Sequence, residues 1–200
     1  MAANPELETE TSWTYEIGLL KNLWFGSKLR AATYYMDISD YQQHNYISGE
    51  PSAQVYNIDV ELYGVELELS KSFSNGLRGY LSYTWKDWSN EDHPFDSEKT
   101  HYFMENQPQN SVKLGLDYRL WEGGLVTLNS KYIDERESKQ DVALNDALIV
   151  DVGAQHTFNL QYTDFTLKGY VNNVTDEDYE LRAGYPMPGI NTGIRGEFKF

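Results

Sequence analysis

Two regularities constrain what this chain can fold into: its side chains alternate between apolar and polar, and its short connections alternate with long ones. The alternation is clearest over residues 111–120 (SVKLGLDYRL), 164–174 (DFTLKGYVNNV) and 189–200 (GINTGIRGEFKF). A two-residue period places one lipid-compatible and one hydrated set of side chains on opposite faces of a strand. Each run has the 9 to 11 residues, roughly, that a tilted strand needs to cross a hydrocarbon core. The sequence therefore predicts an all-β fold of antiparallel, up-and-down transmembrane strands, forming the wall of a β-barrel.

The connections between the strands indicate how such a wall is oriented. Short connections with hairpin dipeptides, such as Asn75-Gly76 and Gly123-Gly124, alternate with long ones at about 47–55, 89–108, 137–146 and 176–188. Bacterial outer-membrane barrels have short periplasmic turns and longer extracellular loops, so Phe200 is expected on the periplasmic side. About nine strands are expected, over residues 12–22, 28–46, 56–72, 76–88, 109–120, 124–136, 147–159, 164–175 and 189–200.

Composition agrees with this interpretation and excludes several others. A net charge of -15 argues against a nucleic-acid partner, whose phosphates would be repelled. The sequence contains no run of about 18 apolar residues, so it predicts no transmembrane helix. A barrel needs no such run, because its strands expose only every second residue to lipid. We expect one domain, residues 1–200, without a linker. Residues 1–4 carry no apolar signal-peptide core, so an outer-membrane location requires that the export signal is missing from this sequence or lies upstream of it.

Five segments in order along the chain resemble the signatures of TonB-dependent outer-membrane receptors. They are residues 4–18 (NPELETETSWTYEIG), 35–42 (YMDISDYQ), 63–68 (YGVELE), 170–179 (YVNNVTDEDY), and 184–189 (GYPMPG) together with the terminal Phe200. The resemblance covers essentially the whole chain. It departs from the family pattern at residues 7–10, where the proline usual before the first glutamate is replaced.

The resemblance implies both an architecture and a function. Receptors of this family have a 22-stranded barrel that is filled by an N-terminal plug domain. This chain resembles the C-terminal nine strands, with the plug domain absent and the wall open if alone. An odd number of antiparallel strands supports that expectation, because single-chain bacterial barrels have even numbers. The implied function is TonB-dependent uptake of a scarce nutrient, a ferric siderophore above all, across the bacterial outer membrane, with the TonB complex acting through the missing plug.

The C-terminal residues Ile194, Phe198 and Phe200 resemble the membrane-insertion signal that the outer-membrane assembly machinery reads as an exposed strand edge. The alternative is an ordinary strand that ends in phenylalanine. Two further groups have structural and functional interpretations. Aromatic girdles at the two membrane interfaces are expected from Trp24, Trp121 and Tyr162 at short turns and from Trp85 and Trp88 at opposite strand ends. Charges expected on the wet face either contact a plug or pair across strands: Glu66, Glu68, Arg78, Lys86, Lys113, Asp117, Arg119, Lys168, Arg195 and Glu197.

The sequence assigns no catalytic, metal-ligating or cofactor-binding residue. Residues 89–108 contain His93, His101 and several carboxylates, but their spacing matches no metal motif. A nucleophile elbow and a phosphate-binding glycine loop are both absent, so we expect no enzyme, no cofactor and no metal. Ligand-contacting residues stay unassigned. Two alternatives remain open: a small porin-like or adhesion barrel without TonB coupling, and a lipocalin-like carrier, which the charged second face of the strands argues against.

Overall fold

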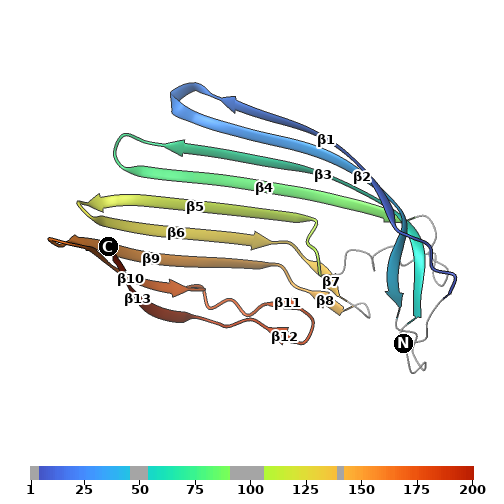
Figure 1. Ribbon diagram of the computed structural model, residues 1–200. Helices are drawn as coiled ribbons and strands as arrows, with labels where there is room; N and C mark the ends of the chain where they lie inside the picture. Colours follow the sequence, from blue (N-terminus) through green and yellow to red (C-terminus); the bar gives the residue numbers. More distant parts are fainter. Residues whose placement is uncertain (1–4, 46–53, 91–105, 139–141) are drawn as a thin grey trace.

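A computed structural model describes residues 5–45, 54–90, 106–138 and 142–200. Nine long strands form one antiparallel sheet in chain order, which confirms the predicted up-and-down wall (Figure 1). Two small hairpins, β7–β8 (Arg136–Ser138, Val142–Leu144) and β11–β12 (Glu180–Arg182, Tyr185–Pro186), lie in the connections. The strands of the sheet are β1 (Thr11–Asn22), β2 (Ser27–Asn45), β3 (Gln54–Ser72), β4 (Leu77–Asn90), β5 (Asn110–Trp121), β6 (Gly124–Ile133), β9 (Ala147–Asn159), β10 (Asp164–Asn172) and β13 (Asn191–Lys199).

The four short turns and the C-terminus lie at one end of the sheet, the short-turn end, and the long connections lie at the other, the long-loop end (Figure 1). Left-handed backbone closes the turns: Gly76 has φ 86° and Gly123 has φ 74°, where glycine avoids the strain that a Cβ would bring. The first turn instead places Phe25 at φ 59°, in a single 3-10 turn over Trp24–Gly26.

β1 and β13 are the two edges of this nine-stranded sheet. Because every neighbour is antiparallel and the number of strands is odd, both edges run from the long-loop end to the short-turn end. Two strands with the same direction cannot pair in antiparallel fashion, so the wall is open, as the strand count predicted.

The register separates two faces across the whole sheet. Leu116 lies opposite Leu128, Leu128 opposite Val152, and Val152 opposite Val171, so the apolar positions predicted strand by strand share one surface, the apolar face. On the other surface, the polar face, Arg78 lies opposite Asp117. The strand predictions for residues 111–120, 164–174 and 189–200 are confirmed in position and in phase.

One feature of β2 departs from the continuous strand expected over residues 28–46. The register with β3 shifts between Ile38 and Tyr41, where Asp40 has φ 58° and donates its N–H to the Asp59 carboxylate at 3.0 Å. This bulge returns Tyr41 to the side of Ile38. The result is a small core at the long-loop end, where Ile38, Ile58 and Val60 pack with Met36, Tyr41 and Tyr56.

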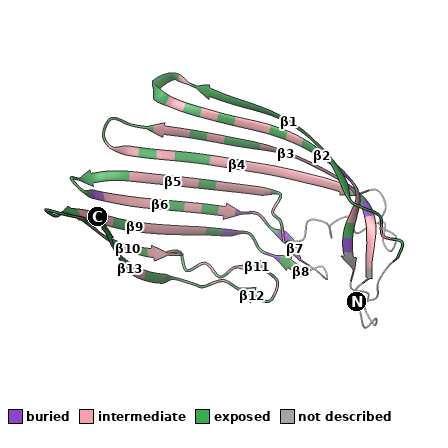
Figure 2. Cartoon of the chain, viewed as in Figure 1, coloured by how far each residue is buried: buried purple, intermediate pink, exposed green. Residues whose placement is uncertain are grey.

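Elsewhere the long strands are mostly exposed or half-buried, and buried residues gather toward the long-loop end (Figure 2). A sheet needs no hydrophobic core of its own along most of its length if its two faces are covered by lipid or by another protein domain. The described residues include no helix with the length and hydropathy required to cross a membrane.

Candidate functional site

Charge on the apolar face is confined to its two ends. Along the strands between them the apolar-face positions carry no charged side chain, over Leu77 to Trp85 in β4 and Leu148 to Phe158 in β9, for example. Stretches of this kind, about 9 to 11 residues per strand, are long enough for a tilted strand to cross a hydrocarbon core. At the long-loop end the charges are acidic, and at the short-turn end they are basic: Asp37, Asp59, Glu61, Asp87 and Asp134 against Lys21 and Lys71.

Tyrosines follow the long-loop border of this band. Tyr35 donates its hydroxyl to Glu61 at 2.7 Å, and Tyr63 donates to Asp87 at 3.2 Å. Tyr83 donates to the amide oxygen of Asn110 at 2.7 Å on the next strand. Each ring lies over the apolar face and each hydroxyl reaches a polar group beyond it, which is how tyrosine settles at a membrane interface.

A second aromatic row crosses the short-turn end of the apolar face. Trp121 donates its indole N–H to His156 Nδ1 at 2.9 Å, and His156 meets Phe158 edge-to-face at 4.3 Å between ring centres. The row continues through Phe165 to Phe198, whose ring centres are 4.6 Å apart. Two expected girdle residues, Trp24 and Tyr162, lie in the turns at this end and are 87% and 84% exposed.

The other two tryptophans that were expected in a girdle lie on different faces of the sheet. Trp85 lies opposite Val65 on the apolar face and packs against Tyr63, with ring centres 5.8 Å apart, as expected for a girdle residue. Trp88 lies opposite Leu62, three positions along the strand and therefore on the polar face. The prediction that Trp88 belongs to a lipid-facing girdle is wrong, because strand ends near a loop do not reveal their phase.

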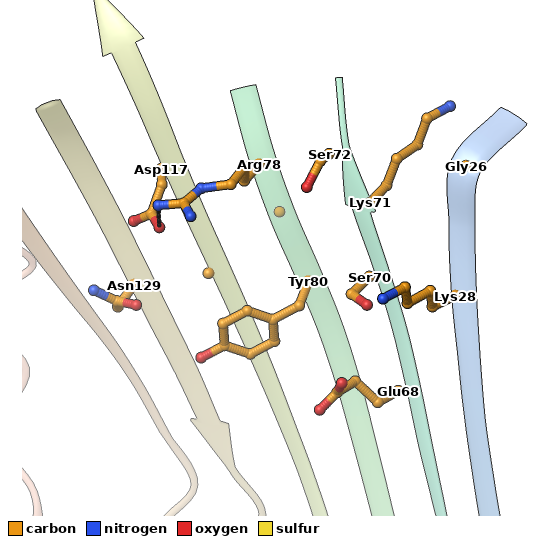
Figure 3. Close-up of a pocket in the computed structure, with 12 residues that line it drawn as sticks. Gly26, Lys28, Glu68, Ser70, Lys71, Ser72, Arg78, Tyr80, Asp117 and Asn129 are labelled. Atoms are coloured by element: carbon orange, nitrogen blue, oxygen red, sulfur yellow. Dashed lines mark hydrogen bonds and ion pairs between the residues drawn. The ribbon is translucent and has the colours of Figure 1, made fainter. Parts of the chain in front are cut away.

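The polar face is hollowed at its short-turn end by an open cavity of about 480 Å³ (Figure 3). Arg78 and Asp117 point toward each other across β4 and β5 and form an ion pair at 3.2 Å. The lining also includes Lys28, Glu68, Lys71, Tyr80 and Asn129. The surface offers charged and amide groups and no apolar pocket, so it suits a hydrated protein surface better than a buried small ligand.

Tyrosines cover glycines on this face. The Tyr34 ring lies over Gly64 of the next strand, and the Tyr80 ring lies over Gly115 in the same way. A Cβ on Gly115 would collide with the Tyr80 ring. Covering a glycine with a cross-strand aromatic ring stabilises the strand at its weakest position and flattens the tyrosine against the wall.

Basic side chains oppose one another at two places on the polar face. Lys113 lies directly opposite Lys131, and Lys168 directly opposite Arg195. Within the described part of the chain neither Lys113 nor Lys131 forms an ion pair, and opposed like charges destabilise a sheet. The predicted wet face is thus confirmed in position by the register, and its charges only partly pair with one another.

At the long-loop end, buried Asn173 organises the connection between β10 and β13. Its amide oxygen accepts the Glu177 N–H at 2.9 Å, while its amide nitrogen donates to the carbonyls of Glu177 and Pro188 at 2.9 and 3.3 Å. Its own N–H donates to the Asp151 carboxylate at 2.8 Å. One residue therefore closes a loop that the sequence alone identified only as a long connection.

Arg136 joins that loop to the neighbouring hairpin. It is 3% exposed and donates to the carbonyls of Asn145 and Glu180 at 3.4 and 2.8 Å. Burial lowers the pKa of Arg136, which still leaves the guanidinium charged at neutral pH. Residues 134–138 and 142–147 thus form one platform with residues 173–190. Sequence reasoning missed this platform because its contacts join residues far apart in the chain.

The residues of the expected insertion signal lie at the β13 edge. Ile194 and Phe198 project from the apolar face and are 82% and 58% exposed, and Phe200 follows the strand at 99% exposure. The rings of Phe198 and Phe200 are stacked, with centres 6.4 Å apart. The aromatic row therefore runs as far as the free edge of the sheet.

The acidic loop with His93 and His101 lies outside the described residues. Among the residues that are described, no group of three or more histidine or carboxylate side chains is arranged to hold a metal ion.

Comparison with known proteins identifies the family of this wall. The family model described as "TonB dependent receptor-like, beta-barrel" matches residues 1–174. The chain belongs to this family. The TonB-dependent receptor resemblance of the sequence signatures is therefore confirmed.

Solved structures show the same fold at low sequence identity. The chain is similar to the pyoverdine outer membrane receptor FpvA from Pseudomonas aeruginosa PAO1, with a TM-score of 0.73 and 16% identity over 97% of this chain and 30% of that one. The copper transporter OprC is similar with a TM-score of 0.74 and 17% identity, over 94% of this chain and 31% of that one. For the ferric-catecholate import receptor Fiu from E. coli K12, the TM-score is 0.67 and the identity is 18%, over 98% of this chain and 27% of that one. The chain thus spans about a third of the length of these proteins.

Proposed function

We propose that this chain is barrel wall of a TonB-dependent receptor in the bacterial outer membrane, and that the receptor takes up a ferric siderophore. The observation that carries the proposal is the division of one nine-stranded sheet into an apolar face, which is uncharged between its two ends, and a charged polar face. Such a wall has lipid on one side and a hydrated interior on the other. FpvA and Fiu, which share the fold, are named as receptors for pyoverdine and ferric catecholates.

The polar face receives a plug domain in this proposal. Opposed cations at Lys113 and Lys131 favour an anionic partner group, because a carboxylate placed between them relieves their repulsion. The open cavity beside Arg78 and Asp117 supplies further hydrogen-bonding groups. The TonB complex acts on the receptor through that plug, and the wall itself performs no covalent chemistry.

The platform at the long-loop end faces the cell exterior in this orientation, where the ligand arrives. On the edge strand β13, which runs from this platform to the short-turn end, Ile194, Phe198 and Phe200 serve as the signal read by the outer-membrane assembly machinery. Their exposure at a free strand edge supports that role, since an unpaired edge templates further pairing. Deleting Phe200 is expected to lower the yield of heat-modifiable, folded receptor; an unchanged yield would contradict the role.

The porin-like or adhesion barrel is the weaker alternative. A small closed barrel needs its first and last strands to pair, and the edges β1 and β13 run in the same direction. The family match and the receptor folds also favour the transporter.

Uptake of radiolabelled ferric siderophores tests the proposal. The gene product that carries residues 1–200 is expressed in a strain without its own siderophore receptors, with and without TonB. Uptake that requires TonB is expected, and residues 1–200 alone behind an export signal should transport nothing. Solute leakage that is independent of TonB would instead support the porin-like alternative.

A further inference from the structure

Lys71 occupies an unusual position near the end of β3, on the apolar face at the short-turn end. Its ammonium group lies 4.5 Å from the ring centre of Phe73 and 5.7 Å from that of Phe25. The two rings attract the cation through their quadrupoles and hold it at the rim of the sheet. Lys71 is also among the residues that line the cavity beside Arg78 and Asp117, but Figure 3 shows its side chain directed away from that ion pair.

Among the described residues, no acidic side chain forms an ion pair with Lys71. All acids on the apolar-face positions of the described strands lie at the opposite, long-loop end. Within the described residues Lys71 forms no ion pair, although the whole chain has 31 acidic and 16 basic residues. A cation in this position is therefore available to an anion from outside the protein.

The surface beside Lys71 is apolar and open. Leu69, two residues earlier in β3, lies opposite Leu81 of β4, and the two are 44% and 48% exposed. Gly79 lies opposite Lys71 and presents no side chain of its own, and the Leu116 side chain of β5 extends over it. These groups match the parts of a phospholipid. The cation of Lys71 suits the phosphate, the two exposed rings suit the membrane interface, and the leucine surface suits an acyl chain.

We propose that Lys71, held by Phe25 and Phe73, binds the phosphate of an anionic phospholipid in the leaflet at the short-turn end. The proposal rests on the proposed function, because it needs the apolar face to be in lipid. The headgroup phosphate pairs with the ammonium, and the acyl chain lies along Leu69 and Leu81. A zwitterionic lipid binds more weakly, since its own cation competes for the phosphate.

The probe is phosphatidylglycerol, titrated against the folded protein in detergent micelles and followed by native mass spectrometry, with phosphatidylcholine as the comparison. The variant Lys71→Gln should weaken binding of one phosphatidylglycerol by about fivefold, the effect of one basic side chain at an anionic surface. Lys71→Arg should retain the binding. Lys28→Gln is the matched control, because Lys28 lies at the same end on the polar face.

Equal affinity of wild type and Lys71→Gln for phosphatidylglycerol would overturn the proposal, as would equal affinity of the wild type for the two lipids. Displacement of the lipid by millimolar inorganic phosphate would show a site for free phosphate instead. Phe25→Ala, which keeps the charge and removes one exposed ring, gives a second variant and should weaken binding less than Lys71→Gln. Failure of siderophore uptake with retained lipid preference would reject the proposed substrate and leave this site intact.

Discussion

The two faces of this sheet are built from the same strands, yet they follow opposite rules. On the apolar face charge is excluded from the middle and tyrosine hydroxyls reach polar partners only at the border. On the polar face cations oppose each other at Lys113 and Lys131, and a cavity opens beside Arg78. A two-residue period thus lets one backbone present two different surfaces. In the proposed receptor, lipid covers the apolar face and a hydrated plug covers the polar face.

The largest difference between the faces should come from a charge placed in the middle of the sheet. Leu128→Arg on the apolar face is expected to lower the free energy of unfolding in lipid by about 2–4 kcal/mol, because a cation at the bilayer midplane loses its hydration. Asn129→Arg, the adjacent exposed residue on the polar face, should change it by about 0.5 kcal/mol or less. Denaturant titration of both variants in vesicles measures this, and equal losses would contradict the assignment of the faces.

Glycine substitutions should sharpen the comparison at a smaller scale. Gly115→Val forces the Tyr80 ring off the polar face, which should cost about 1–3 kcal/mol of unfolding free energy through overpacking. Gly169→Ala on the apolar face meets no atom within 4 Å and should be neutral or slightly stabilising. The same titrations apply, and a Gly115→Val variant as stable as wild type would show that the tyrosine does not depend on that glycine.

Reversing one of the opposed cations tests the electrostatics of the polar face. Lys131→Glu replaces a repulsion with Lys113 by an attraction and should raise the unfolding free energy by about 0.2–1 kcal/mol in the wall without a bound partner. The gain should shrink at high salt. If Lys131→Glu instead destabilises the wall at low salt, the two ammonium groups do not repel each other as the register implies.

The smallest effect is expected for the ion pair of Arg78 and Asp117. Their side chains are 53% and 41% exposed, so water screens the pair. A double-mutant cycle with Arg78→Gln and Asp117→Asn should give a coupling of about 0.5 kcal/mol, measured by denaturant titration. A coupling several times larger would mean that the cavity is less hydrated than its open shape suggests.

The strands and their faces were predictable from the sequence, because alternation is a local property that each strand shows by itself. The features that were missed depend on contacts between distant residues. Asn173 closes a loop through Asp151 and Pro188, and no local pattern marks such a residue. The bulge at Asp40 needs β3 as its partner, so residues 28–46 appear continuous in sequence. Trp88 was placed on the wrong face for a related reason, since aromatic identity does not fix phase.

The candidate functional surfaces were likewise predictable where they follow from local alternation, and not where they depend on contacts between distant residues. The charges of the polar face followed from alternation, but the opposition of Lys113 to Lys131 required the register of β5 with β6. The contacts of Lys71 with the rings of Phe25 and Phe73 could not be predicted, because the two rings lie in turns that are distant in sequence and meet only in the folded sheet.

The most direct test of the two-faced wall uses single cysteines, which are unique labels because the chain has none. Nitroxides attached one at a time to residues 111–118 of β5 in the membrane-inserted protein report collisions with oxygen, enriched in lipid, and with a water-soluble nickel complex. Val112, Leu114 and Leu116 should favour oxygen, whereas Ser111, Lys113 and Asp117 should favour nickel, with a period of two. Equal accessibility along β5, or the reverse phase, would contradict the account.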